Sequence, residues 1–203
     1  MFMIIRIAIG LLLIIIGFLI VRNLKLNHKK VICLIVTISS VILTVALAFV
    51  PFENVFVTFS SPQEAYDYIS FGDKDIKLRV EGDTSDLIVG DKNGKEELLI
   101  LPKNSDGWKI DTGKSIENIS QKIHDGITVN VFRYKQTSEC YVMIFNSNGG
   151  ELELKDNLNS VFVNTKEYNS AIEKDYYTYY AYLAEYNSDY ELTLNGETVR
   201  LAG

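Results

Sequence analysis

Few residues of this 203-residue chain have the types and spacing that catalysis or metal binding requires. His124, beside Asp125, is the one histidine after residue 50, whereas a zinc site needs three or four convergent ligands. No HExxH, paired CxxC or GxSxG motif is present. We therefore expect no catalytic residue, no metal and no cofactor, and we expect His124 to be a solvated residue at a helix end.

The alternative function is that of a hydrolase. His124 could act as a general base, and carboxylate pairs such as Glu96 with Glu97 could do acid–base chemistry. Such pairs sit at expected turns and strand edges, where acidic residues normally only solvate the surface. Cys140 lies in an apolar run, which favours a buried, unreactive thiol.

Tyrosines are the most informative residues, because seven of them crowd residues 176–190. In an extended strand over Tyr176–Tyr186, alternation places Tyr177 and Tyr179 on one face and a second set on the other. Either both sets are buried, or the second set forms an exposed surface for a protein or a sugar ring. That second set supplies the partner-binding candidates, which are Tyr176, Tyr180, Tyr182 and Tyr186.

The elements that position these residues begin with an apolar hairpin in residues 1–50. Two uncharged or nearly uncharged runs, 2–21 and 31–50, are each long enough for a helix to cross a bilayer about 30 Å thick. The loop 22–30 between them is basic, which predicts that it stays in the cytoplasm. The residues that set this topology are Arg22, Lys25, Lys29 and Lys30.

The charge distribution agrees with that topology. All 26 acidic residues follow residue 50, together with 15 of the 20 basic ones, so the outer part has a net charge of 15 − 26 = −11. We expect a multi-pass protein of the cell membrane, with both termini and the C-terminal region outside the cytoplasm. An acidic outer region disfavours nucleic acid as a partner. An alternative is a signal peptide cleaved after Ala48.

Residues 51–203 predict a mainly β, α+β region in two halves. Residues 51–111 form an α+β subdomain, in which Ser61, Pro62 and Glu64 begin a short helix and Asn93-Gly94 turns a hairpin. Residues 112–126 are polar and have a weak helical pattern, which indicates a linker. Residues 127–203 alternate with period two over about seven short strands, which predicts an immunoglobulin-like β-sandwich.

Short segments of the outer region resemble known sequences. The segment Phe59–Tyr66, the pair Leu101–Lys103 and Gly107–Ile110, and the closing Tyr190–Gly196 are similar to uncharacterised membrane-anchored or exported proteins of Gram-positive bacteria. The resemblance implies an extracytoplasmic envelope protein and gives no catalytic residue.

These observations lead to one functional expectation and one alternative. We expect a membrane-anchored binding protein of the cell envelope, held in the lipid bilayer by residues 1–50 and contacting an envelope protein or a wall polymer. The alternative is an envelope hydrolase that uses carboxylates or His124.

Overall fold

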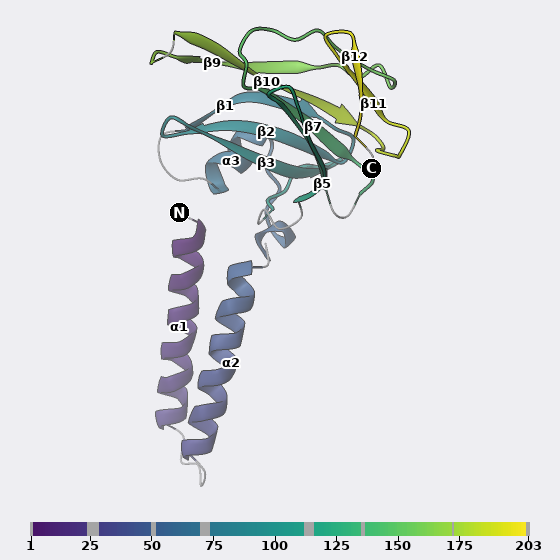
Figure 1. The fold of residues 1–203 in the computed structure, drawn as a ribbon. Helices are drawn as coiled ribbons and strands as arrows, with labels where there is room; N and C mark the ends of the chain where they lie inside the picture. Colours follow the sequence, from purple (N-terminus) through teal and green to yellow (C-terminus); the bar gives the residue numbers. More distant parts are fainter. Residues whose placement is uncertain are drawn as a thin grey trace.

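The computed structural model describes residues 2–23, 29–49, 52–69, 74–111, 116–134, 137–171 and 173–201. For residues 2–7, 23, 29–30, 46–49 and 52 it describes the backbone alone. A hairpin of two long helices projects from a layered β body (Figure 1). The expectation of a mainly β region is confirmed.

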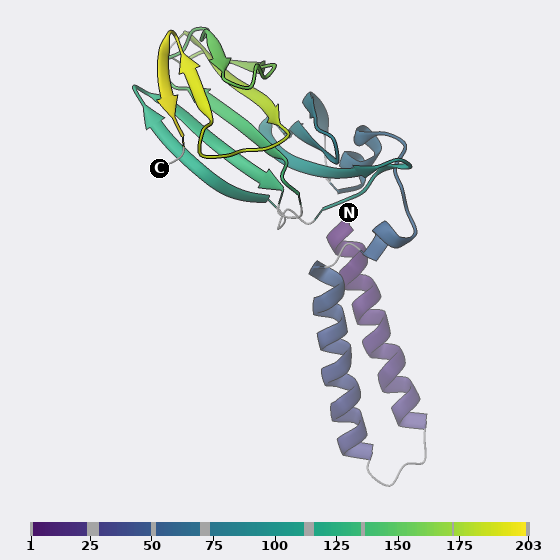
Figure 2. The same cartoon turned by 90° about the vertical axis from the view of Figure 1, so that its right-hand side faces the viewer.

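The hairpin consists of α1 (Phe2–Asn23) and α2 (Lys29–Phe49), which lie side by side and run antiparallel (Figures 1 and 2). The helices approach closely because Gly10 faces Thr44 and Gly17 faces Val36, where an added Cβ would collide. Two hydroxyls donate to the helix backbone, from Thr37 to the Cys33 carbonyl and from Thr44 to the Ser40 carbonyl.

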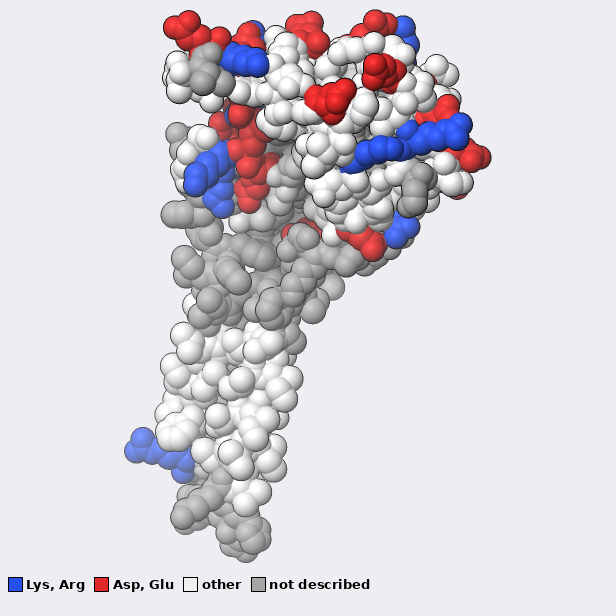
Figure 3. All heavy atoms as spheres, viewed as in Figure 1, with Lys and Arg blue, Asp and Glu red and all other residues white. Residues whose placement is uncertain are grey.

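Large apolar side chains cover the outside of the hairpin. Leu12, Phe18, Leu34 and Ile42 are each more than half exposed, and one basic group near the loop end interrupts the uncharged surface drawn in Figure 3. Among the described residues, none of the helices combines the length and the hydropathy needed to cross a membrane.

A short 3-10 helix, η1 (Phe52–Val55), leads into the body, and α3 (Pro62–Ile69) follows. The predicted cap forms, because the Glu64 amide donates to Ser61 Oγ at 3.2 Å and the Glu64 carboxylate accepts from the Ser60 amide at 3.0 Å. The cap satisfies amides that the first turn of a helix leaves without intrahelical partners.

The first sheet is an antiparallel meander of β1 (Lys74–Glu81), β2 (Ser85–Lys92), β3 (Lys95–Asn104) and β4 (Gly107–Trp108). Its predicted turn is confirmed, since Asn93 and Gly94 have φ angles of 54° and 76°. The α3 helix packs beneath this sheet (Figure 1), and Ala65, Ile88 and Leu101 belong to the core between them.

The second half of the body is a sandwich of two antiparallel sheets. The larger sheet has the order β5-β6-β7-β10-β9, formed by Ile116–His124, Ile127–Tyr134, Cys140–Asn146, Lys174–Leu183 and Val163–Asn169. The smaller sheet has the order β12-β11-β8, formed by Glu197–Arg200, Glu191–Leu194 and Leu154–Asp156. Figure 2 shows the yellow β11–β12 hairpin lying across the green five-stranded sheet.

Four layers therefore stack on one another: α3, the first sheet, the five-stranded sheet and the three-stranded sheet. One core, with Val142 and Leu192, fills the sandwich, and another, with Leu87 and Tyr180, joins the first sheet to the outer face of the five-stranded sheet. The predicted boundaries between a subdomain 51–111, a linker 112–126 and a domain 127–203 stay a prediction. The second core contains residues from both sides of these boundaries.

Two sequence expectations differ from the structure. Residues 116–124, expected within a linker, form β5, and a bulge between Asn118 and Ser120 explains why Ile116, Ile119 and Ile123 lack strand alternation. The sheet order also differs from an immunoglobulin arrangement, in which the chain crosses to the other sheet between its second and third strands, because here the first three strands, β5, β6 and β7, all lie in one sheet.

Candidate functional site

The four partner-binding candidates are distributed between buried and open environments. Tyr180 is 1% exposed and packs in the core between the first sheet and the five-stranded sheet, where Tyr182 is partly buried beside it. Tyr186 lies beyond the end of β10 and packs against the sandwich core instead. Tyr180 and Tyr182 therefore do not form an exposed surface, because the first sheet covers the middle of the β10 face, and partner binding by the four tyrosines stays a prediction.

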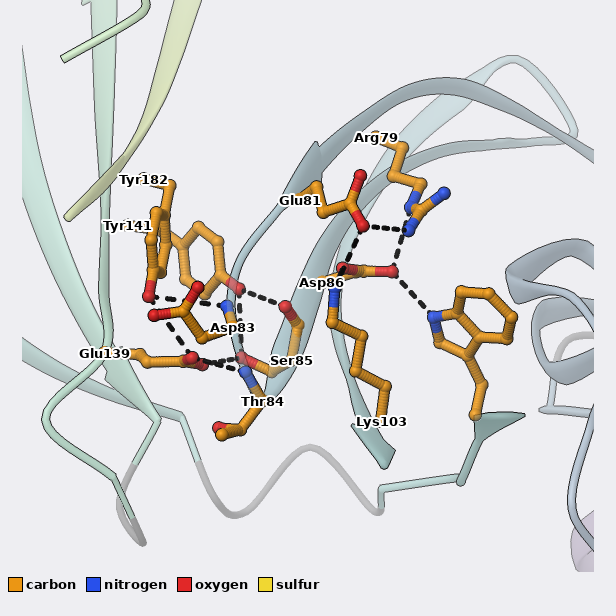
Figure 4. A network of polar contacts seen from close by, with 11 residues as sticks. Arg79, Glu81, Asp83, Thr84, Ser85, Asp86, Lys103, Glu139, Tyr141 and Tyr182 are labelled. Carbon is orange, nitrogen blue, oxygen red and sulfur yellow. Dashed lines mark hydrogen bonds and ion pairs between the residues drawn. The ribbon is translucent and has the colours of Figure 1, made fainter. Parts of the chain in front are cut away.

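Tyr182 belongs to a polar network that joins the two larger sheets (Figure 4). Its hydroxyl donates to Glu139 Oε1 at 3.3 Å, and the other Glu139 oxygen accepts from Ser85 Oγ at 2.6 Å. The Tyr141 hydroxyl donates to the Ser85 carbonyl at 2.9 Å. Glu139 and Ser85 are 4% and 0% exposed, so protein donors satisfy this carboxylate inside the body.

A second buried carboxylate lies on the first sheet, also in Figure 4. Asp86 Oδ2 accepts from Arg79 Nε at 2.8 Å and from Trp108 Nε1 at 2.6 Å, while Asp86 Oδ1 lies 3.0 Å from Lys103 Nζ. Both networks were missed in the sequence, because nothing in its pattern pairs residues on strands whose register is unknown. In both networks the protein's own donors bind the buried carboxylate, so we interpret Glu139 and Asp86 as structural residues that hold neighbouring strands together.

Tyr176 alone among the four candidates lines an open hollow with other aromatic residues. The β7, β9 and β10 strands have neighbouring ends there, and these ends place Phe145, Tyr168 and Tyr176 in one lining. We call this site the aromatic hollow, with a volume of about 590 Å³ and a lining of Phe145, Ser147, Glu167, Tyr168, Asn169, Ser170 and Tyr176.

The rings of the aromatic hollow are accessible and well placed for stacking. The Phe145 and Tyr176 ring centroids are 6.1 Å apart and their planes differ by 15°, so the two rings lie nearly parallel. Tyr168 is 64% exposed and Phe145 is 36% exposed. Phe145 and Tyr168 were not among the candidates, since only the β7–β10–β9 register shows that they adjoin Tyr176.

The polar rim of the aromatic hollow includes one carboxylate. Glu167 Oε1 lies 3.5 Å from Lys77 Nζ of β1, and Lys77 also approaches Asp91 at 3.1 Å and Glu96 at 3.8 Å. Burial raises the pKa of the Glu96 carboxyl, and the Glu167 carboxylate raises it further. The Lys77–Glu167 ion pair joins β1 of the first sheet to β9 of the five-stranded sheet, and Glu167 also lines the aromatic hollow.

Tyr186 lines a different open hollow, also of about 590 Å³. Lys122 of β5 and Arg200 of β12 lie on its wall, and Arg200 Nε pairs with Glu191 at 2.8 Å. Tyr176 and Tyr186 thus lie at separate sites, and the structure brings no two of the four candidates into the same hollow among those described.

The candidate residues for a hydrolase do not gather in a buried centre. His124 ends β5 beside a turn, with its side chain 38% exposed, and its neighbours Asp125 and Glu197 are 86% and 73% exposed. His124 therefore ends a strand, which corrects its placement at a helix end. Cys140 is 1% exposed, and burial raises the pKa of its thiol to about 11, which keeps it protonated and unreactive as expected.

No protein-family model, no curated protein and no solved structure matches this chain. The geometry of the aromatic hollow is therefore the basis for the functional proposal.

Proposed function

We propose that this chain is a membrane-tethered binding protein of the cell envelope, and that the aromatic hollow holds a ring of a wall polymer. The observation that supports it is the nearly parallel Phe145–Tyr176 pair, in a lining that also includes the exposed Tyr168. Flat aromatic rings offer a large contact area at a low cost in conformational entropy.

The rim of the aromatic hollow supports a hydroxylated ligand. Ser147, Asn169, Ser170 and Glu167 place hydroxyl, amide and carboxylate groups around the rings. Such groups can donate to and accept from sugar hydroxyls while the ring face stacks on the aromatic side chains. A purely apolar partner would leave these groups without hydrogen bonds.

The proposed tether is the α1–α2 hairpin, inserted in the bilayer with its basic loop in the cytoplasm and both chain ends outside. Helices of 22 and 21 residues have the length of the hydrocarbon core, about 30 Å. Exposed leucine and isoleucine side chains on both helices favour contact with lipid. The hydropathy of the described helices does not itself support a membrane span. The support for insertion is the exposure of these apolar side chains and the confinement of all acidic residues to positions after residue 50.

A photocrosslinking experiment tests the proposal. A benzophenone amino acid replaces Tyr168 in the full chain, expressed in intact cells, and a second chain has the same group at the exposed Asp106. We expect polymer-bearing crosslinks from position 168, lost when Phe145→Ser and Tyr176→Ser are added, and none from position 106. Crosslinks to a protein alone, or equal crosslinks from both positions, would contradict the wall-polymer ligand.

A further inference from the structure

The turns of two hairpins lie next to each other at one side of the sandwich. Asp125-Gly126 connects β5 to β6, with φ angles of 45° and 74°, and Asn195-Gly196 connects β11 to β12. These turns bring His124 Nε2 within 3.1 Å of Glu197 Oε2, although the residues are 73 positions apart. The contact bridges the five-stranded and three-stranded sheets.

His124 is the last of three β5 side chains that reach toward the end of the chain. Ser120 Oγ donates to the Leu201 carbonyl at 2.8 Å, and Lys122 Nζ donates to the Arg200 carbonyl at 2.7 Å. Both of those polar groups end on backbone oxygens. The third side chain differs, because His124 faces the Glu197 carboxylate instead of a backbone oxygen. Asp125 Oδ2 also lies near the same ring nitrogen, at 3.7 Å.

The two carboxylates have no basic partner other than this histidine. Within the part of the chain that the structure describes, the ion pairs of Asp125 and Glu197 involve His124 alone. Lys122, the nearest lysine along β5, is occupied by the Arg200 carbonyl. An uncompensated pair of carboxylates around an imidazole is an attractive environment for a cation, and the net negative charge of residues 51–203 adds to it.

We propose that His124, Asp125 and Glu197 bind a divalent transition metal of the zinc class. Metal–ligand bonds of about 2.0–2.1 Å in a tetrahedral site separate neighbouring ligand atoms by about 3.4 Å. The distances from His124 Nε2 to the two carboxylate oxygens, 3.1 and 3.7 Å, bracket that separation, and all three ligand atoms lie within 4.8 Å of one another.

The donor set also selects the metal. One imidazole with two carboxylates suits Zn²⁺ and its neighbours, whereas Ca²⁺ and Mg²⁺ favour all-oxygen sites. Three protein ligands leave the fourth position to water, which the exposure of the site supplies. A bound ion connects the β5–β6 hairpin to the β11–β12 hairpin and so stabilises the sandwich against opening at this side.

Metal titration of the full chain in detergent, purified without a histidine tag, tests the proposal. We expect one equivalent of Zn²⁺ by calorimetry, visible absorption from bound Co²⁺, and a rise in Tm of about 5 °C or more at a hundredfold excess of Zn²⁺ over its Kd. His124→Gln and Glu197→Gln should each weaken binding by at least about tenfold, because each removes a ligand.

Two control variants keep the test specific. His28→Gln and Glu185→Gln remove a histidine and an acidic residue outside the cluster, and both should bind Zn²⁺ like the original chain. Because His124 and Glu197 are exposed, circular dichroism should show folded variants. Absence of Zn²⁺ binding, or equal binding in His124→Gln, would overturn the proposal whatever the ligand of the aromatic hollow.

Discussion

At the scale of single residues, Asp86 is a buried carboxylate that connects strands of the first sheet through ion pairs and a hydrogen bond. Its carboxylate has no exposed surface, and Arg79, Lys103 and Trp108 all approach its two oxygens. A buried charge is tolerated only when nearby groups compensate for its lost hydration. Glu81 contacts the same two cations from outside, at 3.2 Å each, with 69% of its side chain exposed.

Asp86→Ala should lower the free energy of unfolding by about 3 kcal/mol, because it leaves the Trp108 donor and two cations without their buried acceptor. Glu81→Ala is the matched control and should cost less than about 1 kcal/mol, since exposed pairs contribute little. Denaturant unfolding of the full chain, followed by circular dichroism, measures both. Equal losses for the two variants would contradict the structural role of Asp86.

The raised pKa of Glu96 makes the free energy of unfolding depend on pH, and the direction of this dependence follows from the direction of the shift. Its pKa is raised above 4.5 by burial and then by Glu167, so the folded state binds more protons than the unfolded state just above that value. The free energy of unfolding therefore falls as pH rises through this window. Asp91 has the opposite shift, because the Lys77 hydrogen bond lowers its pKa below 3.8, and its window lies at more acidic pH.

Glu96→Gln should remove part of the stability that is lost as the pH rises above 4.5, because the neutral amide has no charge to desolvate. Asp91→Asn should leave most of that part of the profile in place, because Asp91 is the weakest of the groups that raise the pKa of Glu96. Thermal unfolding of the full chain and both variants across this range provides the measurement. A Glu96→Gln profile parallel to that of the original chain would disprove the assignment.

At the scale of elements, local sequence predicted the pieces whose determinants lie within a few residues. The cap of α3 at Ser61, the Asn93-Gly94 turn and the alternation of β6 depend on neighbouring residues. The β5 strand was missed because its bulge disrupts alternation, and a bulge depends on the partner strand. The aromatic hollow was found only through Tyr176, because its other rings come from strands that pair at long range.

The docking of α3 on the first sheet depends on a glycine. A Cβ at Gly90 would collide with the hydroxyl of Tyr66, which is fully buried beneath β2. Gly90→Ala should therefore cost about 1–3 kcal/mol through overpacking. The Tyr66 hydroxyl and the ring carbon that bears it both collide with the added Cβ. Tyr66→Ala removes the whole ring, so Gly90→Ala should cost much less in that background in a double-mutant cycle of unfolding free energies. Strictly additive losses would show that the two groups do not meet.

At the scale of the whole molecule, the layers explain why Tyr180 is a poor probe of binding. The first sheet packs on the five-stranded sheet and covers the middle of β10, so binding through this face of β10 is expected at its uncovered end, where Tyr176 lies. This stacking could not be predicted from sequence, because alternation gives each strand a buried face without saying which sheet covers it.

The whole molecule also separates an apolar hairpin from an acidic body, and this separation is the basis of the proposed location. Figure 3 shows charged side chains of both signs over the body, whereas the described side chains of the hairpin are almost all uncharged. Such a division is expected when one part of a chain contacts lipid and the other contacts water.

Labelling of single cysteines in intact cells tests this central claim most directly. Cys33→Ser removes the thiol of α2, and Cys140 should stay silent because it is buried with a pKa of about 11. In that background, Asp106→Cys tests the body and Lys25→Cys tests the basic loop. We predict that a membrane-impermeant maleimide labels position 106 in intact cells and position 25 only after permeabilisation. Labelling of position 25 with position 106 protected, or equal labelling of both in intact cells, would contradict the account.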